Sequence, residues 1–393
     1  MTNSEIVIVG AARTPMGAMQ GELGTVPAPR LGAAAIAAAL QRAGVAPEQV
    51  DEVVMGCVLA AGLGQAPARQ AALAAGLPVS TGCTTVNKMC GSGMKALMLA
   101  HDQLRAGSTG LMVAGGMESM SLAPYLLPKA RAGLRMGHAQ LLDHMFFDGL
   151  EDAYEGGLMG SFAQQTANQY GVSREAMDDF AFESLSRARR AMAEGAFTEE
   201  IAAVLVEHRH DTVAVATDEQ PGKAKPDKIR KLRPAFAKDG TVTAANSSSI
   251  SDGAAALVVT TAEHARMLGL APLARVLAHA THARLPAEFT LAPVGAISKV
   301  LEKVGWQADE VDLYEINEAF AVVTLLAINE LGLDAARVNV NGGACALGHP
   351  IGASGARIVV TLLHALRRRG LKRGVAALCI GGGEATAVAL ELI

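Results

Sequence analysis

The sequence predicts an α/β protein built from two similar halves, with a long insertion in the first half. Three observations support this prediction: strand-like apolar runs alternate with helix-like segments, part of the chain repeats at a constant offset, and a charged region separates the copies. Alternating strands and helices imply parallel sheets with helices on their faces. Of the 393 residues, 50% are apolar and 18% are charged, so the chain can bury a large core in two or three domains.

The repeat is clearest in two segments that each end a helix and begin a strand. Residues 40–51 (LQRAGVAPEQVD) match residues 301–312 (LEKVGWQADEVD) at an offset of 261. Gly44 and Gly305 hold the same place in both copies, where a glycine ends a helix. We expect the strands that follow at 53–55 and 313–316.

A second match keeps nearly the same register. GSGMKA, from Gly91, opens a helix after a predicted strand at 83–86, and GASGARI, from Gly352, opens a helix after a predicted strand at 338–340. Gly93 and Gly355 differ by 262, so we interpret the two halves as a duplication.

Composition divides the chain into three parts. The insertion is richer in charged and aromatic residues, and it contains a predicted helix at 174–195 and a basic segment at 223–233. The apolar run at 253–261 then returns the chain to the first sheet. We expect a first half at 1–118 and 250–270, an inserted loop domain at 119–249, and a second half at 271–393.

Charge and cysteine usage narrow the class of protein. The net charge of −4 argues against a nucleic-acid partner, and no apolar run approaches the ~18 residues of a membrane helix. The first residues lack the pattern of a secretory signal. Five cysteines without CxxC or Cys/His metal spacing argue against disulfides and zinc. We therefore expect a cytoplasmic protein with free thiols and no metal.

Cys90 is the first candidate for chemistry. It lies between a predicted strand and a helix start, where free N–H groups and a partial positive charge favour the nucleophilic thiolate. Gly91 and Gly93 leave room for a substrate to approach. The alternative is a buried, inert cysteine, which is the commonest state of a free cysteine. We assign that state to Cys57, Cys83 and Cys345.

His349 lies in the loop 341–357, between Gly348 and Pro350. The repeat places it opposite Asn87, hence beside Cys90 if the halves pack face to face. A Cys–His pair is the usual way to activate a thiol. The alternative is a structural loop histidine.

Two further patches follow apolar strands. Cys379 precedes three glycines, which can present a thiol beside N–H groups in an oxyanion hole, although three glycines also make a simple sharp turn. Asn317 can orient a water or a carbonyl group, or it can cap the helix that follows.

Together these segments resemble the thiolase family over essentially the whole chain. The matching strings are NKMCGSGMKA, MESM, KLRPAF, SDGAAA, NEAFA, NVNGGACALGHPIGASGAR and CIGGG. Within the family, the sequence is most similar to the acetyl-CoA acetyltransferases (acetoacetyl-CoA thiolases) of bacterial type. The resemblance implies a duplicated αβαβα layered fold with mixed sheets, in which the inserted loop domain binds coenzyme A.

The resemblance also implies roles for single residues. Cys90 takes the acyl group, and His349 activates it and faces the acetyl oxygen. Cys379 moves a proton to or from the Cα of the second substrate. Asn317 holds a water in one oxyanion hole, and the N–H groups of Cys90 and Gly381 form the other.

The resemblance also implies residues that contact the substrate. Ser248 matches the position that touches the pantetheine arm. Arg230 and Lys231 belong to the basic segment that can meet the phosphates of coenzyme A, although a solvated charged face is the alternative.

Three positions depart from the family pattern. Leu158-Met159 stands where His-Met is common in members specific for acetoacetyl-CoA, and Phe289 replaces a methionine that caps the acyl pocket. Bulky Phe289 favours a short acyl group, whereas Leu158 can open the pocket elsewhere. Glu384 follows the three glycines where Met or Gln is more usual.

The implied activity is the reversible condensation of two acetyl-CoA molecules to acetoacetyl-CoA and CoA, through acetyl-Cys90 and without a cofactor. One alternative is a 3-ketoacyl-CoA thiolase of fatty-acid β-oxidation with broader specificity, and a remote one is a non-catalytic CoA- or lipid-binding protein. A decarboxylating ketoacyl synthase is disfavoured because Cys379 has no place in it. We expect a homotetramer, with apolar clusters at 125–127 and 145–147 forming contacts, and no nucleic-acid or membrane partner.

Overall fold

The computed structural model describes residues 5–207 and 209–393. Within these ranges the main feature is one ten-stranded sheet, ordered β12-β13-β14-β11-β1-β10-β5-β3-β4, with β2 paired to β10. Its strands are β1 (Ile6–Arg13), β2 (Gly17–Ala18), β3 (Glu52–Gly56), β4 (Gly82–Val86), β5 (Leu111–Ser119), β10 (Ser251–Thr261), β11 (Ala274–Ala283), β12 (Leu313–Ile316), β13 (Arg373–Ile380) and β14 (Glu384–Leu392).

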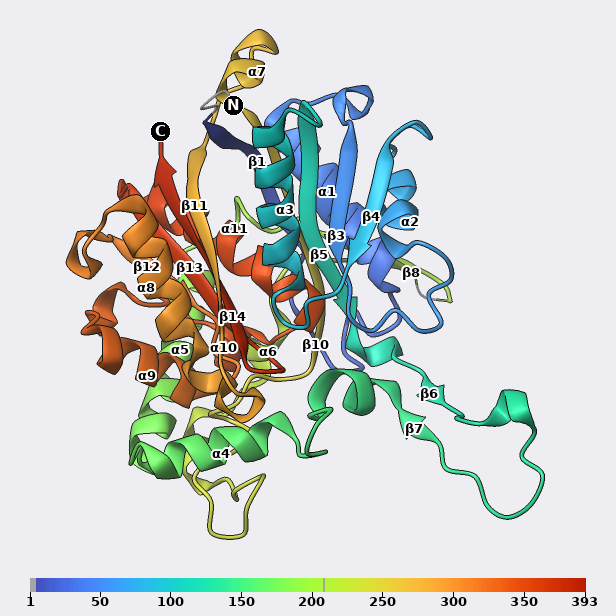
Figure 1. Cartoon of the computed structure of the whole chain (residues 1–393), viewed down its shortest axis with the longest axis vertical. Coiled ribbons are helices and arrows are strands. Elements are labelled where there is room, and N and C mark those ends of the chain that lie inside the picture. The colour runs from blue at the N-terminus through green and yellow to red at the C-terminus, as the bar shows by residue number, and fades with distance from the viewer. Residues whose placement is uncertain (1–4, 208) are drawn as a thin grey trace.

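Helices cover this sheet and build the insertion (Figure 1). They are α1 (Ala28–Ala43), α2 (Pro67–Ala74), α3 (Ser92–Ala106), α4 (Met159–Gln169), α5 (Arg174–Ala193), α6 (Glu219–Lys223), α7 (Ala262–Met267), α8 (Ala292–Val304), α9 (Ala321–Leu331), α10 (Ala344–Leu347) and α11 (Ile351–Arg369). The expected alternation of strands and helices is present.

The parallel sheets inferred from alternation alone were wrong, whereas the mixed pairing implied by the family resemblance is confirmed. β3 pairs in parallel with β4 and β5, and β12 with β13, but β1, β10, β11 and β14 pair antiparallel with their neighbours. The insertion returns the chain beside β5, and three glycines turn β13 back into β14, so neither connection is a crossover. The β1–β11 pairing joins both halves in one mixed sheet.

The predicted strand at 338–340 is also absent. Val338 makes one isolated bridge to Tyr314, and Asn339 has a φ of +48°, which breaks an extended run.

The repeated segments have the same structure in both halves. Gly44 ends α1 with a φ of +66°, and Gly305 ends α8 with a φ of +70°, as predicted. α1 packs on β1, β5 and β10, whereas α8 packs on β11, β13 and β14. The duplicated helices thus cover equivalent strands.

The two central helices cross closely at their first turns. A Cβ on Gly93 would lie 2.8 Å from the Ala356 backbone nitrogen, and one on Gly355 would lie 2.4 Å from that of Met94. α11 also packs on β5 and β10 of the first half and on β13 of the second. The turns that precede these helices, with Cys90 and His349, are thereby brought to one side of the molecule.

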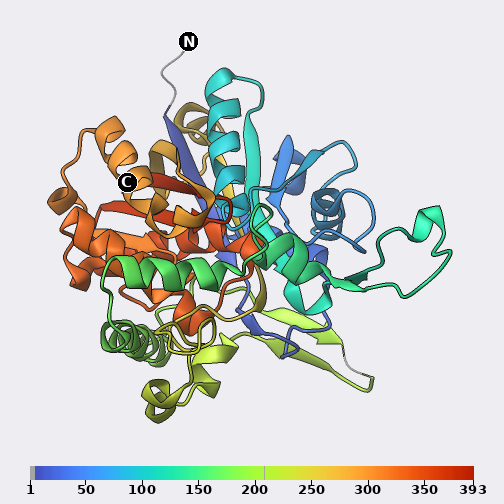
Figure 2. The same cartoon turned by 60° about the horizontal axis from the view of Figure 1, so that its bottom comes forward.

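The insertion leaves the sheet after β5 and returns at β10, and these two strands pair along most of their length. Its hairpin arm, which contains β6 (Tyr125–Leu126) and β7 (Leu142–Asp143), projects from the body (Figure 1, Figure 2). A second hairpin is formed by β8 (Val204–Glu207) and β9 (Thr212–Val215). The predicted helix at 174–195 is α5, which ends two residues earlier.

A buried ion-pair group ties the insertion to the first half. The Arg13 guanidinium lies 2.6 Å from the Glu200 carboxylate and 2.7 Å from that of Asp218, and all three side chains are fully buried. Removing one partner of such a group leaves an uncompensated charge in the core.

Among the described helices, none combines the length and the apolar character needed to cross a membrane.

Gly355→Ala should destabilise the protein, because its Cβ meets a backbone atom that no side-chain rotation can move. We expect the free energy of unfolding to fall by about 1–3 kcal/mol. A thermal-unfolding scan measures this as a lower midpoint. Gly222→Ala is the matched control, since its Cβ would meet nothing within 4 Å; equal midpoints for the two variants would contradict the close crossing.

Candidate active site

A cavity of about 360 Å³ lies beside the turns that precede the two central helices. Its lining is predominantly apolar, with a few polar groups, as is typical of a small-molecule site. Eight of the residues singled out from the sequence line it: Cys90, Leu158, Met159, Ser248, Phe289, His349, Cys379 and Gly381. The cavity therefore brings together both predicted catalytic thiols and the predicted base.

Cys90 is held at a sharp strand-to-helix turn. Met89 has a left-handed φ of +48°, which is uncommon for a residue with a side chain. Its carbonyl accepts the N–H of Ser92 at 2.9 Å and the Ser92 hydroxyl at 2.6 Å, and its N–H donates to Asn87 Oδ1 at 2.9 Å. These bonds fix the turn and present the Cys90 sulfur to the cavity.

The helix start was expected to favour the thiolate of Cys90, and burial opposes this effect. Burial raises the pKa of Cys90 to about 11, and it outweighs the N–H groups of Gly381 and of Cys90 itself, which lower the pKa. The nearby carboxylate of Glu118 raises it further. The thiol is therefore neutral near pH 7 and needs a base to react.

His349 has the properties of that base. Its Nδ1 lies 2.6 Å from Ser354 Oγ, and the Ser354 hydroxyl donates to the Pro350 carbonyl at 2.9 Å, so the hydroxyl oxygen can accept the Nδ1 proton. Nε2 has no hydrogen-bond partner among the described residues. Burial, together with the positive charge of Arg357, lowers the pKa of His349 to about 3. The ring is thus neutral, with a free lone pair on Nε2.

Asn317 lies behind the imidazole and does not line the cavity. Its Nδ2 is 3.4 Å from His349 Nδ1, and its Oδ1 accepts from Arg357 Nη2 at 3.3 Å. It is not a helix cap, because the next helix, α9, has Phe320 at its N-cap.

Cys379 is the penultimate residue of β13, before Ile380 and the three-glycine turn into β14. Burial raises the pKa of Cys379 well above its ordinary value, and the nearby Cys90 thiol raises it further. Gly382 and Gly383 have φ values of +90° and +89°, so the turn uses conformations open to glycine. Gly381 precedes them, and its N–H acts on the Cys90 sulfur.

Aromatic side chains line part of the cavity. Phe289 is 3% exposed and packs edge-to-face on Phe320 with ring centroids 6.2 Å apart. It belongs to one apolar cluster with Cys379 and Met159. The sequence analysis did not assign several other lining residues to this site, among them Phe146, Leu150, Phe236, Phe320 and Ile351. Phe236, Phe320 and Ile351 lie inside the strings KLRPAF, NEAFA and GHPIGAS, which could have pointed to them.

The basic segment lies beside this cavity. Neither Arg230 nor Lys231 lines it, and Arg230 forms an ion pair with Asp179 at the surface. A neighbouring cavity of about 290 Å³ shares Ala244 and Ser249 with the first and is lined by Lys225 and Lys228. Within the basic segment, these two lysines are therefore the basic side chains that line the cavity adjoining the candidate site.

The remaining cysteines lie outside this cavity. Cys57 faces Glu118 with its sulfur 3.7 Å from Oε1, and burial is the main reason that its pKa is raised. Burial also raises the pKa of Cys345, beside Glu318. All five cysteines, within the described ranges, carry free thiols.

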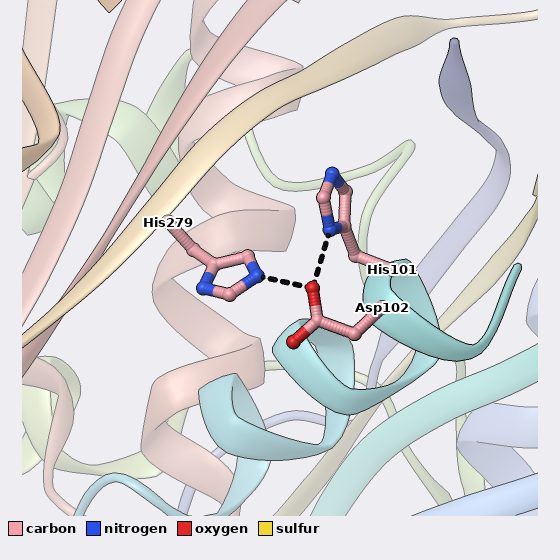
Figure 3. A group of neighbouring side chains, drawn as sticks. All are labelled: His101, Asp102 and His279. Carbon is pink, nitrogen blue, oxygen red and sulfur yellow. Dashed lines mark hydrogen bonds and ion pairs between the residues drawn. The ribbon is translucent and has the colours of Figure 1, made fainter. Parts of the chain in front are cut away.

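One group of three side chains with metal-ligand chemistry occurs in the described part of the chain, away from the cavity. His101 Nδ1 and His279 Nε2 lie 3.0 and 2.9 Å from the same oxygen of Asp102, as Figure 3 shows. Sequence spacing did not reveal this group, because His279 follows Asp102 by 177 residues. Two ring N–H groups donating to one carboxylate oxygen account for the arrangement, which links α3 to β11.

Two family models match nearly all of the chain. The model described as "Thiolase, N-terminal domain" matches residues 6–263, and "Thiolase, C-terminal domain" matches residues 270–392. An acetyl-CoA acetyltransferase of Cupriavidus necator is 52% identical over 390 residues, which are 99% of each chain. One from Pseudomonas aeruginosa is 51% identical over 388 residues, 98% of this chain and 99% of the relative.

Solved structures agree with these relatives. An acetyl-CoA acetyltransferase from Bacillus anthracis superposes with a TM-score of 0.97 at 41% identity, covering 99% of each chain. A thiolase from Ascaris suum in complex with coenzyme A gives a TM-score of 0.94 at 43% identity, covering 99% of this chain and all of the other. The predicted layered α/β fold is thereby confirmed, and the chain belongs to the thiolase family.

Proposed function

We propose that the protein is an acetyl-CoA C-acetyltransferase, which reversibly condenses two acetyl-CoA molecules to acetoacetyl-CoA and CoA. The observation that supports this most directly is the single cavity lined by Cys90, His349, Cys379 and Gly381. The names of relatives about 50% identical over nearly the whole chain agree with it.

The first step is acyl transfer to Cys90. His349 Nε2 takes the thiol proton while Sγ attacks the acetyl-CoA carbonyl, and the N–H groups of Cys90 and Gly381 stabilise the oxyanion. The C–S bond to coenzyme A then breaks, and the departing sulfur receives the proton held by His349. Because both groups are neutral at rest, proton transfer accompanies the attack.

The second step is carbon–carbon bond formation. Cys379 passes its proton to His349, which is neutral again after the first step, and the resulting thiolate removes a proton from Cα of the second acetyl-CoA. The enolate carbon attacks the acetyl carbonyl on Cys90. The C–S bond to Cys90 then breaks, the Cys90 sulfur takes the proton held by His349, and Cys379 keeps the proton from Cα, so both thiols are neutral again. A thiolate whose pKa is raised by burial is a strong base, which suits a weakly acidic Cα–H.

The remaining residues bind the substrate and orient the catalytic groups. Asn317 supports the imidazole and holds the water of the other oxyanion hole, and Ser248 contacts the pantetheine arm. The phosphates extend toward the basic segment, where Lys225 and Lys228 are better placed than Arg230 and Lys231. Each step uses groups of this chain alone, so the proposed reaction requires no cofactor.

The domain organisation and the oligomeric state are part of the same proposal. We retain halves at 1–118 with 250–270 and at 271–393, and an inserted domain at 119–249, in a cytoplasmic homotetramer. The exposed Tyr125 and Met136 of the hairpin arm support contacts between subunits. The 145–147 cluster contributes less than expected, because Met145 is buried and Phe146 lines the cavity.

A 3-ketoacyl-CoA thiolase of broader specificity is the second candidate. The apolar lining and the absence of a polar group at Leu158 favour it, whereas buried Phe289 favours the acetyl substrate.

Acetyl-CoA should acetylate Cys90, because acyl transfer precedes the condensation and forms a covalent intermediate. Intact-protein mass spectrometry followed by peptide mapping should find one acetyl group on Cys90. Cys90→Ala should abolish it, and Cys83→Ala, which removes a thiol that lines neither cavity, should not. A wild-type protein without an adduct would support the non-catalytic binding alternative.

Alkylation of Cys90 should report its raised pKa. With a thiol pKa of about 11, the reactive thiolate fraction rises about tenfold per pH unit below that value. We therefore expect the iodoacetamide rate at Cys90 to rise from pH 6 to pH 9 without levelling off. A plateau near pH 6 would instead indicate a preformed thiolate–imidazolium pair and would refute the neutral resting state.

Phe289 should limit the acyl length. Thiolysis rates for four-, six- and ten-carbon 3-ketoacyl-CoA should fall steeply after four carbons in the wild type. Phe289→Ala should raise the six-carbon rate relative to the four-carbon rate by about tenfold, the order of discrimination that one hydrophobic pocket gives. Similar rates for all three substrates in the wild type would favour the broader thiolase.

A further inference from the structure

An ion pair joins the two turns that carry the candidate catalytic thiols. Lys88 Nζ lies 2.6 Å from Glu384 Oε2, although 296 positions separate the residues. Lys88 precedes Cys90 by two residues, and Glu384 directly follows the three glycines after Ile380. The side chains are only 20% and 34% exposed, so solvent screens this pair less than a fully exposed one.

The Lys88 end of the pair is rigid. The Lys88 N–H donates to Ser92 Oγ at 2.8 Å, and its carbonyl accepts the Gly91 N–H at 3.0 Å. Lys88 is thus part of the same hydrogen-bonded turn that fixes Cys90, and its side chain extends from that turn toward β14.

The Glu384 end is attached to the sheet. Its backbone pairs with Ile380 across the three-glycine turn and with Ala283 of β11. Ile380 packs on the Cys90 turn, because a Cβ on Gly91 would lie 2.4 Å from Ile380 Cδ1. Both residues that flank the glycines therefore contact the turn that carries Cys90.

The residues between these two contacts need external support. Three consecutive glycines have more conformational freedom than any other tripeptide, yet Gly381 must keep its N–H directed at the Cys90 sulfur. An oxyanion hole works only when its donors are preorganised. Packing by Ile380 restrains one end of the tripeptide, and the ion pair restrains the other.

We propose that Lys88 and Glu384 are a positioning pair that holds the Gly381 N–H in place for the oxyanion formed at Cys90. The proposal rests on the proposed function, since it concerns the acyl-transfer step. In this proposal the pair does not contact the substrate. It fixes the position of the three-glycine turn relative to the turn that carries Cys90.

A double-mutant cycle on the rate of Cys90 acetylation tests this role. Lys88→Met and Glu384→Met should each slow acetylation by about tenfold, less than the loss of an oxyanion donor, and should leave KM within about twofold. The double variant should be no slower than either single variant, because both remove the same interaction. Lys88→Arg should recover most of the rate.

Arg275→Met is the matched control, since Arg275 pairs with Glu391 at the far end of β14 at 3.2 Å. Its acetylation rate should equal that of the wild type, and thermal midpoints should show that all variants fold. Additive losses, or a normal rate in Glu384→Met, would overturn the positioning role. A wild-type protein that forms no acetyl adduct would contradict the proposed function, whereas normal adduct formation in every variant would contradict the pair alone.

Discussion

The close crossing of α3 and α11 is the constraint on which the site depends. Gly93 and Gly355 let the first turns of these helices touch backbone to backbone. Each helix follows a turn that carries a functional side chain, Cys90 in one half and His349 in the other. The contact between duplicated helices therefore sets where a thiol and an imidazole from distant parts of the chain meet. The sheet reinforces this placement, because β1 and β11 join the halves and β13 delivers Cys379 to the same edge.

Burial dominates the electrostatics of the site. A helix start favours a thiolate, but at Cys90 desolvation is the larger effect, and the same effect keeps His349 unprotonated. The result is a neutral thiol facing a neutral base, instead of an ion pair. In the proposed reaction, this site develops charge only as a thioester reacts, and the N–H groups of Cys90 and Gly381 then stabilise it. The hydrogen bond from Nδ1 to Ser354 orients the imidazole without charging it.

Features that depend on neighbouring residues, such as helix ends and glycine-rich turns, could be predicted from the sequence. Gly44 and Gly305 end their helices as the sequence indicated, and the glycine-rich strings led to Cys90, His349, Cys379 and Gly381, which all line one cavity. Pairing direction depends on how distant segments return to the sheet, so the alternation of strands and helices did not reveal the antiparallel pairs, and only the family resemblance implied a mixed sheet. The pKa of Cys90 depends on what covers it, and the Lys88–Glu384 pair spans 296 residues. Glu384 was recognised only as a departure from the family pattern, since its partner cannot be identified from nearby residues.

The neutral state of Cys90 affects how readily this thiol is oxidised. Peroxides and other oxidants attack thiolates, and at a pKa of about 11 only on the order of one thiol in ten thousand is ionised at pH 7. Between turnovers the sulfur is therefore a poor target for conversion to sulfenic acid. In the proposed mechanism, the burial that makes a base necessary for acyl transfer also protects the nucleophile from oxidation.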